Sequence, residues 1–113
     1  MLSYVLIIDK RKELSVKYKK SIDDEQTSAV IARTLKDAVA LVQESEPDLI
    51  IISDSIDEDL SSFCVKMRTL TYNTRPNIIA LSKSADTNDR IKVLASGADD
   101  FLSEPVNIEE FKM

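Results

Sequence analysis

The chain has 113 residues, 43% hydrophobic and 31% charged, and its net charge of −5 opposes binding to the phosphate backbone of nucleic acids. Cys64 is the one cysteine and histidine is absent, which excludes a disulfide, a Cys/His zinc site and Ser/His or Cys/His catalysis within these residues. We expect a single cytoplasmic domain that neither spans a membrane nor binds nucleic acid.

Short apolar runs alternate with segments of helical spacing in the first half of the chain. Leu14, Tyr18 and Ile22 recur every fourth residue and predict one apolar stripe of a helix. Thr34, with an acidic residue three positions later, is typical of a helix N-terminus, and Pro47 closes that helix. The predicted elements are strands over residues 4–8 and 29–32, each followed by one of these helices.

The second half of the chain continues the same alternation. Leu49–Ile52 is short and rich in β-branched residues, which predicts a central strand buried on both faces. Leu60–Leu70 has helical spacing, and Cys64 within it is interpreted as a small core residue. Gly97 is expected to have positive φ just after a helix. The remaining predicted elements are a strand over 78–81, a helix that Asp86 or Thr87 can cap, a strand over 101–102, and a last helix, capped through Asn107 and Glu110, that the end of the chain cuts off.

Strands and helices in this order predict an open parallel sheet, in which ligands bind beyond the carboxyl ends of the strands. Polar residues at strand ends also serve simply as helix caps or turn residues, and that interpretation stays open for each of them. Their joint placement on one rim favours an acidic site. The residues on this rim are Asp9 and Lys10, Ser53 and Asp54, Ser82 and Lys83, and Ser103, Glu104 and Pro105.

Four stretches resemble the receiver domain of bacterial two-component response regulators, over nearly the whole chain. They read YVLIID, PDLIIISD, RPNIIALSKS and GADDFLSEPVNIEEF. The resemblance implies an α/β, flavodoxin-like (βα)5 doubly wound fold with a five-stranded parallel sheet of order 2-1-3-4-5 and a truncated last helix. It further implies that residues 1–113 form one receiver domain, the N-terminal part of a longer protein. The domain itself would not be an enzyme. The resemblance is compatible with an attached output domain, such as a diguanylate cyclase or a winged-helix DNA-binding domain, and also with a stand-alone adaptor.

The resemblance assigns the phosphoacceptor role to Asp54. The spacing from Pro47 to Asp54 is one residue longer than is usual in the family, which leaves Ser53 as the competing position. We prefer Asp54 because Leu60 and Phe63 then match the apolar residues of the following helix, and because only a carboxylate can accept the phosphoryl group.

The other site roles are also implied by the resemblance. Asp9, Asp54 and the backbone carbonyl of Ile56 would hold Mg²⁺. Ser82 would contact the transferred phosphoryl group through its hydroxyl. Phe101 occupies the aromatic switch position, where inward or outward packing reports the state of the site.

Two positions depart from the family pattern in opposite directions. Lys10 replaces the second metal-binding acid, and Glu104 replaces the lysine that precedes Pro105, an apparent charge swap. An ammonium group repels a metal ion, so we expect Mg²⁺ binding to be weakened or lost unless Glu104 supplies an oxygen. The alternative is that Lys10 forms a salt bridge with Asp54 or Glu104 without any metal. Ser62 also replaces a glycine of the family.

Three functions follow from these observations. The first is a receiver that accepts a phosphoryl group from a sensor histidine kinase or a phosphotransfer protein and changes a surface that controls its own output domain. That surface comprises the helix before Gly97, the strand at Phe101 and the last helix, and it is also a candidate homodimer surface. The second is a degenerate pseudo-receiver, a phosphorylation-independent interaction or dimerisation module. The third, a flavodoxin-like enzyme or nucleotide binder, is disfavoured because a chain with one glycine has no glycine-rich phosphate loop.

Overall fold

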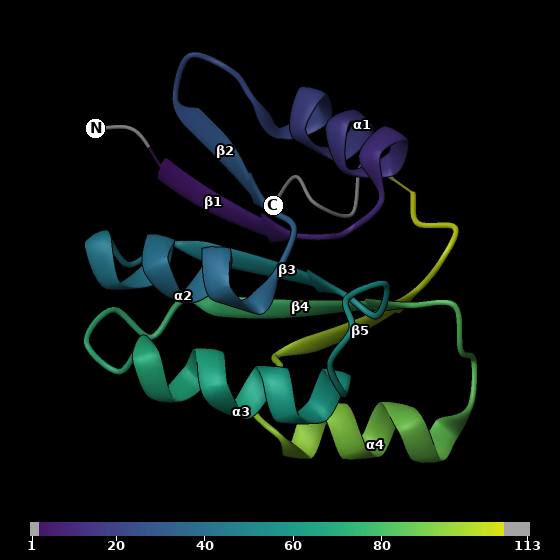
Figure 1. Ribbon diagram of the computed structural model, residues 1–113. Coiled ribbons are helices and arrows are strands. Elements are labelled where there is room, and N and C mark those ends of the chain that lie inside the picture. Colours follow the sequence, from purple (N-terminus) through teal and green to yellow (C-terminus); the bar gives the residue numbers. More distant parts are fainter. Residues whose placement is uncertain (1–2, 108–113) are drawn as a thin grey trace.

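The computed structural model describes residues 3–107, which form one parallel sheet flanked by helices (Figure 1). The strands are β1 (Ser3–Ile8), β2 (Thr27–Ala32), β3 (Leu49–Ser53), β4 (Asn77–Ser82) and β5 (Asp100–Ser103). The helices are α1 (Lys12–Ile22), α2 (Leu35–Glu44), α3 (Leu60–Leu70) and α4 (Thr87–Ala95). The strand order is β2-β1-β3-β4-β5, which confirms the predicted flavodoxin-like topology. Both β2 and β5 are longer than predicted, because their polar ends also pair with neighbouring strands.

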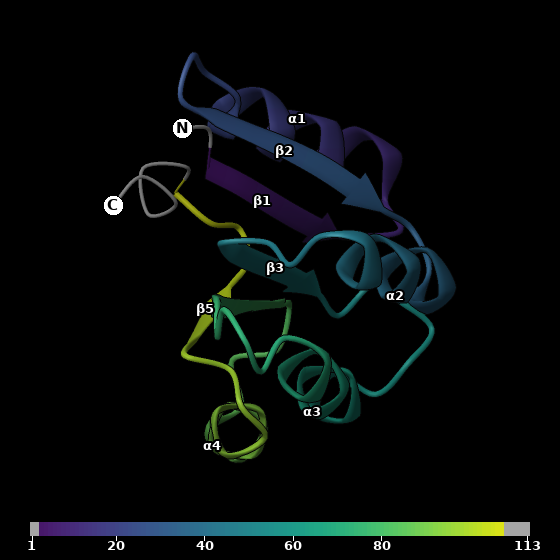
Figure 2. The same ribbon diagram turned by 90° about the vertical axis from the view of Figure 1, so that its left-hand side faces the viewer.

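The two faces of the sheet bury two separate hydrophobic clusters. Side chains alternate along β3, so Ile50 and Ile52 pack with α2, α3 and α4, whereas Ile51 packs with Tyr18 of α1. Figures 1 and 2 show α1 beside β1 and β2, apart from the other three helices. A central strand covered on both sides requires the uninterrupted apolar run that the sequence has at this position.

The helix ends follow the local sequence signals. Thr34 Oγ1 accepts a hydrogen bond of 3.1 Å from the backbone N–H of Asp37 at the start of α2. Of the two candidate caps for α4, Asp86 is the cap and Thr87 is the first helical residue. Gly97 follows α4 with φ of +119°, as predicted. The predicted last helix lies outside the described residues.

The carboxyl ends of the strands face one edge of the sheet, at the right of Figure 1. The loops that follow β1, β3, β4 and β5 all leave the sheet at this edge, because parallel strands end on the same side. Across residues 3–107, no helix is both long enough and apolar enough to cross a membrane.

Candidate functional site

The predicted phosphoacceptor and the predicted switch hydroxyl are in direct contact. Asp54 follows β3, and its backbone N–H donates to the carbonyl of Leu81 at 2.9 Å, which extends the pairing with β4 by one residue. Asp54 Oδ2 accepts hydrogen bonds from Ser82 Oγ at 2.8 Å and from the backbone N–H of Lys83 at 3.0 Å. The end of β4 therefore orients the Asp54 carboxylate.

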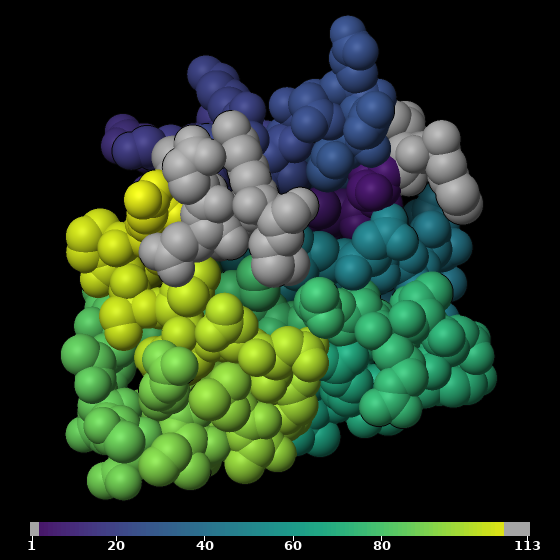
Figure 3. Space-filling model, turned by 180° about the vertical axis from the view of Figure 1, so that it is seen from behind, coloured from purple at the N-terminus to yellow at the C-terminus, as the bar shows by residue number. Residues whose placement is uncertain are grey.

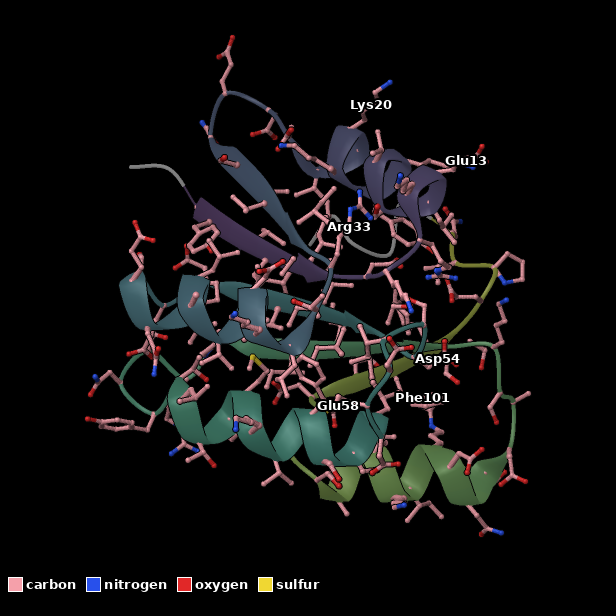
Figure 4. All side chains as sticks on the ribbon, in the orientation of Figure 1. Glu13, Lys20, Arg33, Asp54, Glu58 and Phe101 are labelled. Atoms are coloured by element: carbon pink, nitrogen blue, oxygen red, sulfur yellow. The ribbon has the colours of Figure 1, made fainter. Side chains whose placement is uncertain are left out.

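Asp54 borders a cavity of about 250 Å³ between the end of the sheet, α3 and α4. Phe101 lines the same cavity, and its ring is packed inward with 2% of the residue exposed. Figure 4 shows Asp54 and Phe101 at this end of the sheet. Lys92 of α4 brings an ammonium group to the cavity and lies 3.8 Å from a carboxylate oxygen of Asp59. Asp54 thus combines an accessible carboxylate with hydroxyl, N–H and ammonium groups nearby.

Asp9, the predicted metal ligand, is completely buried and is paired with Arg11. Arg11 Nε donates to Asp9 Oδ1 at 3.0 Å, and Arg11 Nη2 donates to Asp9 Oδ2 at 2.9 Å. The backbone N–H of Arg11 adds a third bond, of 2.9 Å, to Oδ1. The planar guanidinium fits the carboxylate in a bidentate pair, the strongest form of this interaction.

The same guanidinium also pairs with Glu104 at the end of β5. Arg11 Nη1 donates to Glu104 Oε1 at 2.9 Å and Nη2 donates to Oε2 at 3.0 Å. The hydroxyl of Tyr18 donates to Oε2 at 2.6 Å, and the Glu104 side chain is only 6% exposed. Hydrogen bonding to Asp9 and then to Glu104 raises the pKa of Arg11 against the opposing effect of burial, so its charge is permanent.

Two serines complete this network. Ser53 Oγ accepts from Arg11 Nη2 at 2.9 Å and donates to Ser55 Oγ at 3.0 Å, and Ser55 Oγ donates to Asp9 Oδ1 at 2.9 Å. Ser53, the competing acceptor position, therefore joins the partners of Arg11, whereas Asp54 faces Ser82. We call the following set the Arg11 cluster: Asp9, Arg11, Tyr18, Ser53, Ser55 and Glu104.

Arg33, in the segment between β2 and α2, supports the backbone that carries Arg11. Its Nη1 atom donates to the carbonyl oxygens of Asp9 at 3.4 Å and of Arg11 at 3.2 Å, and to Ser15 Oγ at 3.1 Å. Figure 4 shows Arg33 between α1 and the sheet. These bonds hold the turn after β1 in the conformation that directs Arg11 toward Asp9.

The expected partners of Lys10 were wrong. Lys10 Nζ bonds to Asp57 Oδ2 at 2.8 Å, and the two side chains are 57% and 80% exposed. Glu104 is neutralised by Arg11, so the charge swap involves the residue after Lys10. The physical reason is that the strongly hydrated ammonium stays at the surface, whereas the guanidinium forms bidentate pairs inside. The signal for this cation in the sequence was Glu104, because a buried carboxylate needs a positive charge beside it, and a guanidinium can provide one.

The arrangement does not fit the predicted Mg²⁺ site. Asp9 Oδ1 already accepts three hydrogen bonds and Oδ2 a fourth, so a metal ion would have to displace Arg11. A guanidinium about 4 Å away would also repel a cation by ~4 kcal/mol per unit charge at an effective dielectric constant of ~20. Within residues 3–107, no group of three or more Asp, Glu, His or Cys side chains is placed to hold a metal ion. The carbonyl of Ile56 stays a predicted ligand only.

Known proteins resemble this chain along nearly its whole length. The transcriptional regulatory protein KdpE of Mycobacterium tuberculosis is 26% identical over 110 residues, covering 97% of this chain and 48% of that protein. PhoP of Escherichia coli O157:H7, also a transcriptional regulatory protein, is 31% identical over 108 residues, covering 94% and 47%. The chain thus spans about half the length of these curated relatives.

A solved structure and a family model agree with these relatives. A two-component response regulator from Clostridium difficile superposes with a TM-score of 0.88 at 26% identity, covering 96% of this chain and 88% of that one. The family model described as response regulator receiver domain matches residues 5–113. Because this model covers nearly the whole chain, the chain belongs to the receiver domain family of two-component response regulators.

Proposed function

We propose that this receiver domain accepts a phosphoryl group on Asp54 and transmits the change through the surface that contains α4 and β5. The observation that carries the proposal is the 2.8 Å hydrogen bond between Ser82 Oγ and Asp54 Oδ2. This bond supports the proposal because the hydroxyl that would contact a phosphoryl group lies beside the carboxylate that would receive it.

Receiver domains of this family are generally non-enzymatic signalling domains that interact with histidine kinases and output domains. They generally bind Mg²⁺ at the phosphorylation site. For this chain we propose a sensor histidine kinase or a phosphotransfer protein as the donor, and an output domain in the same protein as the recipient of the signal. Homodimerisation through the surface that contains α4 and β5 is part of the same proposal.

The proposed reaction is a phosphoryl transfer from a phosphohistidine. A carboxylate oxygen of Asp54 forms the new P–O bond, the P–N bond to the imidazole breaks, and the electron pair stays on the imidazole nitrogen. Ser82 Oγ and the N–H of Lys83 donate to Asp54 Oδ2, which supports a role for both as donors to the phosphoryl oxygens. Lys92, at the border of the same cavity, supplies positive charge.

The surface next to Asp54 gives the signal a route to partners. Phe101 lines the cavity, and the Arg90 guanidinium lies 6.0 Å from the centre of its ring and bonds to its carbonyl at 3.2 Å. A phosphoryl group in this cavity would take space that the Phe101 ring now occupies. Movement of Phe101 would then displace Arg90 on α4. Figure 3 shows the face on which β5 and the segment after it (yellow) adjoin α4 (light green).

A second candidate function is a phosphorylation-independent interaction module of the same fold. The observation that favours it is the Arg11 cluster, in which the guanidinium occupies both oxygens of Asp9. In this case the surface of α4 and β5 would bind partners without chemistry at Asp54.

Intact mass spectrometry after incubation with a small phosphodonor such as phosphoramidate separates the two functions. The first predicts addition of one phosphoryl group, which Asp54→Asn abolishes and Asp59→Asn leaves intact. Asp59 is the matched control because its carboxylate borders the same cavity, and asparagine caps α3 as well as aspartate does. No incorporation into the folded wild-type protein, with and without Mg²⁺, would refute the first function and leave the second.

A further inference from the structure

The Arg11 cluster brings two buried carboxylates to one cation. The side chains of Asp9 and Glu104 are 1% and 6% exposed, whereas that of Arg11 is 23% exposed. Two carboxylates that are buried to this degree need a positive charge between them. Arg11 provides this charge through four side-chain hydrogen bonds to their oxygens.

We infer that the Arg11 guanidinium takes the place of a divalent metal ion beside Asp9, so that this receiver domain closes its acidic site with an internal cation. Arg11 bonds to the residue after β1, to Ser53 at the end of β3 and to Glu104 after β5. A cation at this point therefore joins three strand ends. Lys10 takes no part in it, because its ammonium group pairs with Asp57 at the surface.

The inference goes beyond the proposed function, because it concerns how the site is held together and not whether Asp54 is phosphorylated. A ligand that binds only the folded state raises the free energy of unfolding by RT ln(1 + L/Kd), where L is the free ligand concentration, so the gain grows with the logarithm of that concentration once it exceeds Kd. An internal cation leaves no room for such a ligand at Asp9. Removal of the guanidinium would leave two uncompensated buried carboxylates and oxygen ligands of the kind that Mg²⁺ prefers.

The test is urea unfolding of wild type and Arg11→Ala with millimolar MgCl₂ or with EDTA. We expect the wild-type midpoint to be the same in both solutions. For Arg11→Ala without Mg²⁺ we expect an unfolding constant about 100-fold or more above that of wild type, with partial recovery on adding Mg²⁺ that grows with the logarithm of its concentration. Stabilisation of wild type by Mg²⁺ that Asp9→Asn removes, or an Arg11→Ala variant whose midpoint does not respond to Mg²⁺, would overturn the inference.

Arg68→Ala is the matched control. The Arg68 side chain, in α3, is 24% exposed and pairs at 2.7 Å with Asp99, which precedes β5, so this pair shares no residue with the Arg11 cluster. Its loss should lower the midpoint without creating any response to Mg²⁺. Equal Mg²⁺ responses of Arg68→Ala and Arg11→Ala would mean a general effect of salt and would refute the inference.

A measurement that does not need Arg11→Ala also decides the question, should that variant fail to fold. We would add Mn²⁺, a paramagnetic substitute for Mg²⁺, and follow the amide signals of Asp9, Lys10 and Asp54 by NMR. We expect no selective broadening; saturable broadening at Asp9 that Asp9→Asn abolishes would overturn the inference. Neither measurement uses a phosphodonor, so failure of the proposed function at Asp54 would be seen separately by mass spectrometry.

Discussion

The hydroxyl of Tyr18 in α1 donates a hydrogen bond of 2.6 Å to Glu104 Oε2, across 86 residues of sequence. The ring of Tyr18 is part of the hydrophobic cluster under α1, and the residue is 2% exposed. Burial first, and then the bond to Glu104, raises the pKa of Tyr18, so the phenol stays a donor. Tyr18 thus connects the core beneath α1 to the charged site.

Tyr18→Phe should therefore destabilise the fold without disturbing the packing of the ring. The variant leaves a buried carboxylate with one donor fewer, which typically costs ~1–3 kcal/mol in the free energy of unfolding. Urea denaturation measures this loss. Tyr72→Phe is the control, because Tyr72 is 71% exposed and should change stability little. Equal midpoints for the two variants would show that the Tyr18 hydroxyl contributes nothing.

The fold could be predicted from the sequence because its signals are local. The run at Ile50–Ile52 has no polar residue to expose, so it had to lie between two layers of helices. Helix α3 begins and ends at the predicted residues, since Leu60, Phe63 and Met67 recur at helical spacing. Gly97 marks the end of α4 because its φ of +119° disfavours other residues.

The Arg11 cluster could not be predicted in the same way. Asp9, Lys10 and Arg11 are consecutive charged residues, and which cation turns inward depends on the path of the backbone before α1. Arg11 precedes α1 in an extended conformation, with φ of −77° and ψ of 126°, which no local sequence motif predicts. The cluster also needs Glu104, which only the folded sheet brings close. The resemblance to the receiver family implied Lys10 as the exchanged charge, because that position departs from the family pattern.

Ser82→Ala should impair phosphorylation of Asp54 if the proposed function holds. Ser82 Oγ lies 2.8 Å from Asp54 Oδ2, where it can donate to an oxygen of the incoming phosphoryl group. Loss of one oriented donor to a group on which charge develops slows such reactions by about 10-fold or more. Rates of phosphoryl incorporation from phosphoramidate, followed by intact mass, measure the effect. Ser84→Ala is the matched control, since Ser84 lines the same cavity but donates to Asp89. A rate for Ser82→Ala equal to that of Ser84→Ala would exclude this role of Ser82.

The Asp23 carboxylate should make stability depend on pH in the acidic range. Its hydrogen bond with Lys19, and then that with the backbone N–H of Ala29, lowers the pKa of Asp23 below the ordinary 3.8. The folded state therefore binds this proton less readily than the unfolded chain. The resulting stabilisation is complete above pH 3.8 and is lost as the pH falls through the folded-state pKa.

Urea midpoints of wild type and Asp23→Asn, measured from neutral pH downward, check this prediction. Wild type should be the more stable protein near neutrality, and the two curves should converge in acid. High salt should reduce the difference in midpoint between the two proteins, because it screens the charge of Lys19. The difference should not vanish, because the N–H of Ala29 still donates to the carboxylate at 2.7 Å. Parallel curves over the whole range would contradict the assignment.

Cys64 should resist thiol reagents as long as α3 stays folded. It is completely buried in the cluster beneath α3, and burial raises the pKa of its thiol from 9.0 to about 11. A rise of two pKa units lowers the thiolate fraction about 100-fold at mildly alkaline pH, before the shielding by the core is counted. Labelling by a disulfide reagent should therefore be fast in urea and, in buffer, no faster than global unfolding. Labelling that outpaces unfolding monitored by circular dichroism would instead mean that α3 separates from the sheet while the remaining core stays folded.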